Sequence, residues 1–156
     1  GAPVTDERLV VKPFLKDDLV VIVPRRHAWA KRKAISPAEL SQEPFIIPAK
    51  DLATSEIILR QIEAAGIKLN AVLEFGNIEA TKKAVEAGLG ISIISRRAIL
   101  KEVKTNRLKA LRLSGVPLQR NLIFVWRKGK QVSKVTEAFL DVFSENIPAV
   151  RGIQKA

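Results

Sequence analysis

Two short stretches of this sequence place turn-forming residues beside hydroxyl and amide side chains that could bind a small anion. In each stretch a predicted strand ends and a predicted helix begins, so unpaired backbone N–H groups would point toward a ligand. A helix N-terminus also carries about half a positive charge, which favours a carboxylate or a phosphate. The alternative is that Thr54 and Asn77 only cap their helices. The candidate residues are Pro48, Ala49, Thr54, Gly76, Asn77 and Ile78.

Catalytic and metal-binding groups are sparse in this sequence. It has no cysteine and a single histidine, His27, so thiol catalysis, thiolate metal sites and multi-histidine metal cages are excluded. No pair of carboxylates is placed together in an apolar pocket, as general acid–base chemistry would need. Gly88-Leu89-Gly90 follows a helix and precedes a strand, which is the wrong order for a dinucleotide-binding loop. We therefore predict no catalytic residues, no metal site, no cofactor and no enzymatic activity.

The chain is strongly basic, with 27 Lys and Arg against 16 Asp and Glu and a net charge of +11. Such a charge invites comparison with nucleic-acid-binding domains. However, the cations are spread among apolar positions and no aromatic stacking platform accompanies them, which favours a solvated basic surface. No apolar run is long enough to span a membrane. The sequence contains no methionine, so we expect a fragment or a processed chain.

Hydrophobic periodicity predicts strands and helices that alternate along one compact α/β domain. The alternation between residues 44 and 94 indicates βαβ units and a largely parallel sheet. Predicted strands cover 8–12, 18–24, 45–47, 71–75, 91–94, 108–113 and 121–127. One predicted helix begins at Ser36, and further predicted helices cover 54–65, 77–88, 96–103 and 133–146.

The helix boundaries carry specific signals. Ser36 and Glu39 have the spacing of a capping box, with Pro37 at the first helical position between them. Gly66 follows the second helix, where a left-handed residue is expected. In the third helix, we expect Lys82 on the polar face, away from the apolar stripe.

Several of these stretches resemble one family, the effector-binding domains of LysR-type transcriptional regulators. The resemblance runs over residues 6–145 and rests on residues 9–24, on the turn His27-Ala28-Trp29-Ala30, and on residues 35–46. Its most specific part is residues 77–95. Residues 75–95, 117–120 and 127–130 are similar to regulators of carbon-fixation and sulfur-assimilation operons.

The resemblance implies a periplasmic-binding-protein-like (type 2) fold with two lobes, joined by crossing strands near 18–24 and 121–127. Residues 22–122 would form the second lobe, and residues 1–21 and 123–156 a remnant of the first. The N-terminal winged helix-turn-helix would be absent from this chain. One departure bears on the ligand: many relatives have a Gly-Ser-Gly-like loop where this chain has residues 51–55.

The resemblance also implies a function. A small, anionic metabolite would bind between the lobes, with the six candidate residues on the second-lobe side. Binding would rearrange a homodimer or tetramer that contacts DNA only through the missing N-terminal domain. Such a regulator would be cytoplasmic and not bound to a membrane. The alternative is a solute-binding protein of a transport system, which shares the two-lobed fold.

Overall fold

The structure is a computed structural model, and it describes residues 6–48, 53–129, 133–136, 138–139 and 142. The chain divides into two compact units, residues 17–120 and a smaller unit of residues 2–16 with 121–156. Strands β1 (Leu9–Pro24) and β7 (Gln119–Arg127) each continue from one unit into the other. Much of the predicted helix 133–146 lies outside the described residues. No helix among those described is long and apolar enough to cross a membrane.

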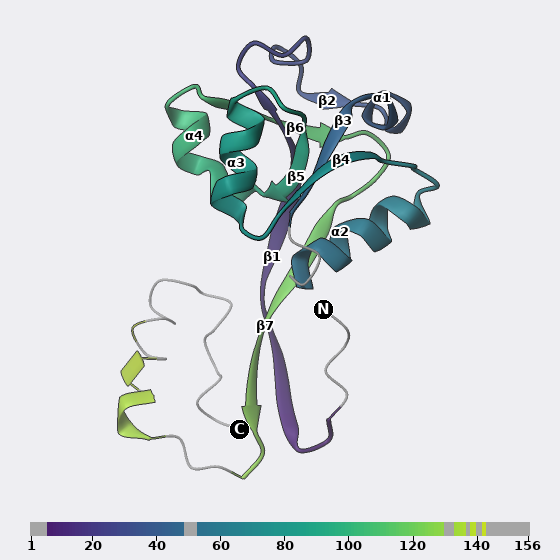
Figure 1. Cartoon of the computed structure of the whole chain (residues 1–156). Coiled ribbons are helices and arrows are strands. Elements are labelled where there is room, and N and C mark those ends of the chain that lie inside the picture. The colour runs from purple at the N-terminus through teal and green to yellow at the C-terminus, as the bar shows by residue number, and fades with distance from the viewer. Residues whose placement is uncertain (1–5, 49–52, 130–132, 137, 140–141, 143–156) are drawn as a thin grey trace. The chain divides into compact units, whose positions relative to one another are not determined.

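The main sheet has β1 near its centre (Figure 1). Its strand order is β2 (Ala34–Ile35), β6 (Leu108–Leu113), β1 and β5 (Ser92–Ser95), and β7 also pairs with β1. Both β5 and β6 run antiparallel to β1, whereas β2 runs parallel to β6. The prediction of a largely parallel sheet is therefore wrong for this sheet. The error arises because β1, from an earlier part of the chain, lies between β6 and β5. Hydrophobic periodicity does not report such long-range pairing.

Between residues 44 and 94 the predicted parallel arrangement is confirmed. Strand β3 (Pro44–Pro48) pairs in parallel with β4 (Asn70–Phe75), and helix α2 (Ala53–Ala64) connects the two strands. A parallel bridge between Phe45 and Ile91 continues this arrangement toward β5. The α/β fold class follows from these alternating units.

Strand β1 departs from the prediction of two short strands, 8–12 and 18–24, because it is one strand of 16 residues. The strand continues through Pro13. Proline is tolerated in a strand where its missing N–H is not needed by a neighbour. The run Leu19–Val23 is buried throughout, as a strand covered on both faces requires.

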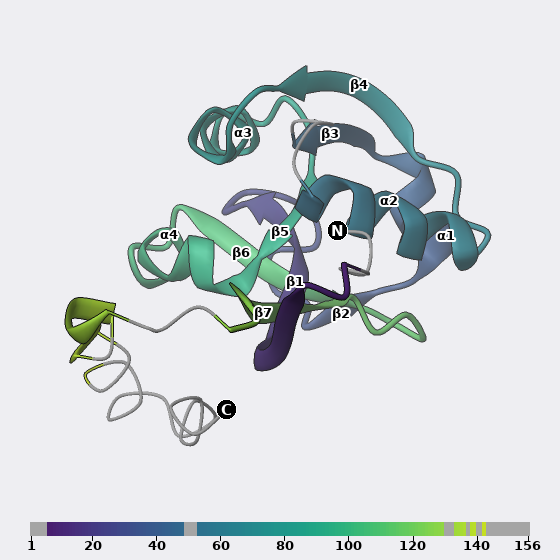
Figure 2. The ribbon, with the colours of Figure 1, turned by 90° about the horizontal axis from the view of Figure 1, so that it is seen from below.

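The helices lie on two sides of the sheets, with α1 (Pro37–Gln42) and α2 on one side, and α3 (Ile78–Glu86) and α4 (Leu100–Lys104) on the other (Figure 2). The capping box of Ser36 and Glu39 is present at α1. One buried cluster contains Val21, Leu40 and Ile58, and a second contains Val20, Val85 and Ile99 of the 3-10 helix η1 (Arg96–Ile99). The alternating side chains of β1 therefore supply both clusters.

Two predicted glycine roles are confirmed. Gly66 has φ +69° after α2, and Gly88 has φ +80° after α3, so both lie in the left-handed region that ends helices. Gly90 has a further role, since a Cβ atom there would lie 2.6 Å from the carbonyl oxygen of Pro44. The Gly88-Leu89-Gly90 segment thus ends a helix and lets β3 approach the start of β5.

Candidate functional site

A small hollow in the larger unit is formed where β3 and β5 end and where α2, α3 and β7 begin. Arg120 is the charged side chain among its described lining residues, beside hydroxyl groups and apolar side chains. The hollow has room for about one water molecule. The lining residues are Pro48, Thr54, Ser55, Ile78, Ile93, Ile94, Ser95 and Arg120.

Three of the six predicted site residues, Pro48, Thr54 and Ile78, meet at this hollow although they come from three different elements. Gly76 and Asn77 immediately precede α3 and are exposed, but they are not among the lining residues. Ala49 lies outside the described residues. The structure thus brings half of the predicted set together.

Arg120 is held by a buried carboxylate. Its Nε donates to Asp17 Oδ2 at 2.8 Å, and its Nη2 lies 2.8 Å from the same oxygen. The remaining nitrogen, Nη1, donates to the hydroxyl of Thr54. The Asp17 side chain is 1% exposed and that of Arg120 is 21% exposed, so a guanidinium with limited access to water faces the hollow.

The second oxygen of Asp17 is also occupied. Ser95 Oγ donates to Asp17 Oδ1 at 3.0 Å, and the exposed guanidinium of Arg97 lies 3.8 Å from that oxygen. The backbone N–H of Arg97 donates back to Ser95 Oγ. A buried carboxylate is costly unless it is paired and hydrogen-bonded, and these contacts satisfy both requirements. They also fix the orientation of Arg120.

The prediction that Thr54 caps α2 is wrong, and the next residue, Ser55, is not a cap either. The helix begins at Ala53, so both residues lie inside its first turn. Ser55 Oγ donates to the carbonyl oxygen of Pro48 at 2.6 Å, which joins the start of α2 to the end of β3. The hydroxyl of Thr54 accepts a hydrogen bond from Arg120.

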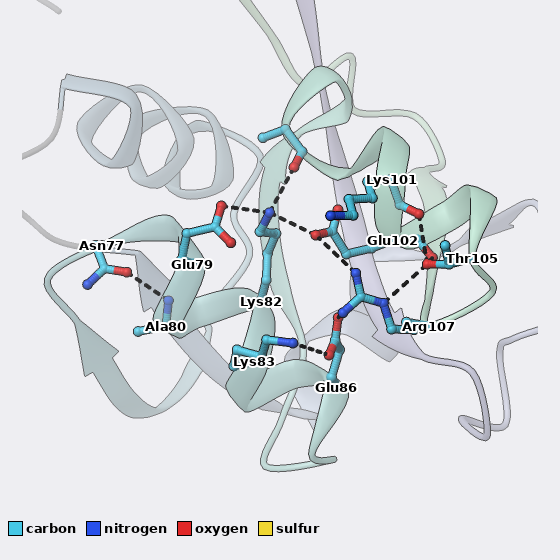
Figure 3. A network of polar contacts seen from close by, with 11 residues as sticks. Asn77, Glu79, Ala80, Lys82, Lys83, Glu86, Lys101, Glu102, Thr105 and Arg107 are labelled. Carbon is cyan, nitrogen blue, oxygen red and sulfur yellow. Dashed lines mark hydrogen bonds and ion pairs between the residues drawn. The ribbon is translucent and has the colours of Figure 1, made fainter.

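The predicted capping role of Asn77 is present. Asn77 Oδ1 accepts a hydrogen bond of 2.7 Å from the backbone N–H of Ala80, in the first turn of α3 (Figure 3). A Cβ atom at Gly76 would meet nothing within 4 Å. The chain before α3 is therefore open to solvent, and a side chain at position 76 would meet no steric barrier.

Lys82 holds α3 to the elements that follow β5 (Figure 3). Its Nζ lies 3.0 Å from Glu102 Oε1, 2.7 Å from Glu79 Oε1 and 3.2 Å from the carbonyl oxygen of Ala98. The expectation that Lys82 lies on a solvent face is wrong, because it is only 6% exposed. The helical pattern placed Lys82 away from the apolar stripe, but that face is covered by η1 and α4.

The charges of Lys82 and Glu102 stabilise each other in this buried position. Burial lowers the pKa of Lys82, but hydrogen bonds and attraction from Glu79 and Glu102 outweigh it, so the pKa of Lys82 is raised. Burial likewise raises the pKa of Glu102, but the hydrogen bond from Lys82 and the charge of Arg107 bring that pKa below its ordinary value. Both groups are therefore ionised near neutral pH, and α3, η1 and α4 are joined by charge.

Among the residues with a described position, no group of three or more His, Cys, Asp or Glu is placed to hold a metal ion. The hollow instead offers a guanidinium, hydroxyl groups and apolar side chains. This set of groups can bind an anion that also has a short apolar part.

The family described as the LysR substrate binding domain matches residues 1–148. The chain belongs to this family. The match confirms the resemblance and the periplasmic-binding-protein-like fold class.

Relatives of this LysR substrate-binding domain include the "HTH-type transcriptional activator CmpR" of Synechocystis sp., which is 34% identical over 150 residues. The "RuBisCO operon transcriptional regulator" of Allochromatium vinosum is 34% identical over 146 residues. The alignments cover 96% and 93% of this chain but 49% and 48% of the two relatives, so the chain spans about half of their length. The predicted similarity to carbon-fixation regulators is confirmed, and the prediction that the domain is not an enzyme agrees with these names.

Solved structures of the same fold include the regulatory domain of Synechocystis PCC6803 CcmR in complex with 2-PG. That structure has a TM-score of 0.82 and 29% identity, and the match covers 97% of this chain and 71% of the other. The effector-binding domain of QuiR in complex with shikimate has a TM-score of 0.78 and 19% identity, over 93% of this chain and 68% of the other. Both are regulatory domains that bind small molecules.

Sequence reasoning missed the charged pair at this hollow, Asp17 and Arg120, and the Ser95 hydroxyl that donates to Asp17. Arg120 was part of a stretch similar to the family, and Arg97 was one cation among many. No local pattern marks Asp17 as the buried partner of a residue near the other end of the domain. Its place beside a five-residue apolar run was the available signal that its side chain would be enclosed.

Proposed function

We propose that this domain is the effector-sensing part of a LysR-type transcriptional regulator, and that it recognises a small anionic metabolite through Arg120. The proposal depends on one observation: a partly buried guanidinium, fixed by Asp17, faces a hollow beside Pro48, Thr54 and Ile78. Guanidinium groups recognise carboxylates and phosphates with paired hydrogen bonds. A fixed orientation reduces the entropy that binding would cost.

The wider organisation belongs to the same proposal. Residues 22–122, most of which belong to the larger unit, would form the second lobe of the sensor, and residues 1–21 and 123–156 would belong to the first lobe. Metabolite binding would change how a homodimer or tetramer presents an N-terminal DNA-binding domain, which acts in the cytoplasm. The relatives named above are regulators, which disfavours the alternative of a solute-binding protein for transport.

The compound 2-PG is the first effector to test, because the CcmR domain was solved with it at 29% identity to this chain. The guanidinium at the hollow supports an anionic compound, bound with its charged end at Arg120. Other carboxylates and phosphates form the comparison set. The ligand that gives the largest gain in melting temperature would then be carried into calorimetry.

The decisive experiment is calorimetric titration of the full-length protein and its Arg120→Gln variant with 2-PG. We expect Arg120→Gln to weaken binding at least tenfold, and Arg120→Lys, which keeps the charge near Asp17, to weaken it less. Arg60→Gln is the matched control, since Arg60 is an exposed cation on α2 and its loss should leave the affinity within twofold. Equal affinity in Arg120→Gln and Arg60→Gln would refute the assignment of Arg120.

A test in the absence of any mutation complements this one. A ligand present at ten times its dissociation constant should raise the free energy of unfolding by about 1.4 kcal/mol. If none of the carboxylates and phosphates tested raises the free energy of unfolding, an anionic effector is contradicted. A gain with an uncharged compound alone would indicate a different effector class.

A further inference from the structure

A second and larger recess in the same unit is separate from the hollow at Arg120. It is an open groove of about 580 Å³, which lies in the size range of small-molecule sites. One wall comes from β1, and the other from the end of β6 and the connection to β7. The lining residues are Asp18, Leu19, Val20, Arg96, Arg112, Leu113, Gly115, Val116, Pro117, Leu118 and Gln119.

The groove contains two cationic side chains without a partner. The guanidinium groups of Arg96 and Arg112 make no ion pair and no side-chain hydrogen bond within the described part of the chain, and both residues are exposed. Arg120 and Arg107, in contrast, are engaged with carboxylates. Two guanidinium groups that share one groove are therefore available to an incoming anion.

The one carboxylate of the groove is already engaged. Asp18 Oδ1 accepts a hydrogen bond of 2.9 Å from Gln119 Nε2. Gln119 is itself fixed by α2, since its backbone N–H and carbonyl both bond to the side chain of Gln61. With two arginines and one aspartate, the charged lining of the groove has a net positive charge.

The groove and the Arg120 hollow are connected through three pairs of adjacent residues. Asp17, Ser95 and Arg120 form the network at the hollow. The sequence neighbours of these residues, Asp18, Arg96 and Gln119, line the groove. Adjacent side chains in a strand point to opposite sides, so in β1 and β7 Asp17 and Arg120 belong to the network at the hollow while Asp18 and Gln119 line the groove. Arg96 begins η1 directly after Ser95.

We propose that this groove is a second ligand site, which binds a small organic anion through Arg96 and Arg112. The charged end of the ligand lies between the two guanidinium groups. The apolar part packs on Leu113, Val116 and Pro117, which lie on the same wall. A ligand here is one peptide unit away from the Arg120 network at three points, so occupancy of the groove can alter the affinity of the hollow.

The site can be tested by heteronuclear NMR on the 17.2 kDa chain, with inorganic phosphate as the probe. Gly115 reports on the groove and Thr54 on the hollow. We expect phosphate to shift the Gly115 amide signal saturably. The apparent affinity for phosphate at Gly115 should fall at least tenfold in the double variant Arg96→Gln/Arg112→Gln, while the phosphate-induced shift of the Thr54 amide remains. The variant Arg25→Gln/Arg26→Gln removes the same charge from exposed positions elsewhere and should leave the Gly115 titration unchanged.

The outcomes separate this site from the one at Arg120. A Gly115 response that survives in Arg96→Gln/Arg112→Gln would overturn the proposal, and so would the absence of any saturable Gly115 response. Loss of the Gly115 response in Arg120→Gln, but not in Arg96→Gln/Arg112→Gln, would mean that Gly115 senses the hollow alone. If phosphate does not shift the Thr54 amide signal while the Gly115 titration is normal, the result would count against the proposed effector site and not against the groove.

Discussion

Arg120 and Asp17 are 103 residues apart in the sequence, yet Nε and Nη2 of the arginine both lie 2.8 Å from the same carboxylate oxygen. This contact joins the first residues of β7 to the part of β1 that enters the larger unit. It also sets the direction of the guanidinium that faces Thr54. The same pair therefore contributes to stability and to the proposed recognition of an anion.

Replacing Asp17 by asparagine should destabilise the domain by about 2–3 kcal/mol. Loss of one partner of a buried ion pair typically costs about 3–5 kcal/mol, and the partial exposure of Arg120 reduces that cost. Urea unfolding followed by circular dichroism would measure the change. Asp18→Asn is the control, because Asp18 is exposed and should lose less than about 1 kcal/mol. Equal losses in the two variants would show that the Asp17 pair has no special role.

The variant Asn77→Asp should separate helix capping from ligand binding. Aspartate caps a helix as well as asparagine does, so stability should stay within about 0.5 kcal/mol of the original, whereas Asn77→Ala should lose about 1 kcal/mol. The Asn77 amide nitrogen makes no hydrogen bond within the described residues and is available to an anion, which a carboxylate would repel. We expect Asn77→Asp to weaken 2-PG binding at least tenfold in calorimetry. Unchanged affinity would leave Asn77 as a cap alone.

Lys82 and Glu102 should show strong energetic coupling. Lys82→Met leaves the Glu102 carboxylate buried beside the more distant Arg107, and we expect a loss of about 2–4 kcal/mol. The double variant Lys82→Met/Glu102→Leu removes the unpaired charge and should recover at least about 1 kcal/mol relative to the sum of the single losses. A double-mutant cycle by urea unfolding measures this coupling free energy between Lys82 and Glu102. Additive losses would mean that the two charges act independently.

The carboxyl group of Glu39 should remain ionised to a lower pH than an ordinary glutamate does. Hydrogen bonds from Arg32 and from Ser36 lower the pKa of Glu39 to about 2. Because this value lies below that of the unfolded chain, the contribution of Glu39 to stability is complete above about pH 4.5 and is lost as the pH falls through about 2. Carboxyl ¹³C titration by NMR would measure the pKa directly, and Arg32→Gln should raise it. Titration of Glu39 near 4.5 in the unmodified chain would contradict the ion pair.

Local features of the fold could be predicted from the sequence because they depend on neighbouring residues. Ser36 and Glu39 form their capping box across three positions, Asn77 caps its own helix, and Gly66 ends α2 through its own backbone angle. Candidate site residues at chain turns were accessible for the same reason. Pro48, Thr54 and Ile78 each lie where an element ends or begins.

The remaining features depend on contacts between distant segments. Neither the burial of Lys82 nor its pairing with Glu102 follows from the α3 pattern, since η1 and α4 decide what covers that face. The Arg120–Asp17 pair joins segments that local periodicity treats separately. The continuity of β1 across the two predicted strands, 8–12 and 18–24, also lies beyond what local periodicity reports.

The pairing of β1 with β5 places a limit on where this domain can change length. Side chains alternate along a strand with a period of two residues, and the register of Leu19–Ile22 against β5 decides which of the two preceding carboxylates is turned toward Arg120. Insertion of one residue between Asp18 and Leu19 would turn Asp18 toward the arginine and turn Asp17 away from it. A change of length before Asp17 would leave both carboxylates on their present sides.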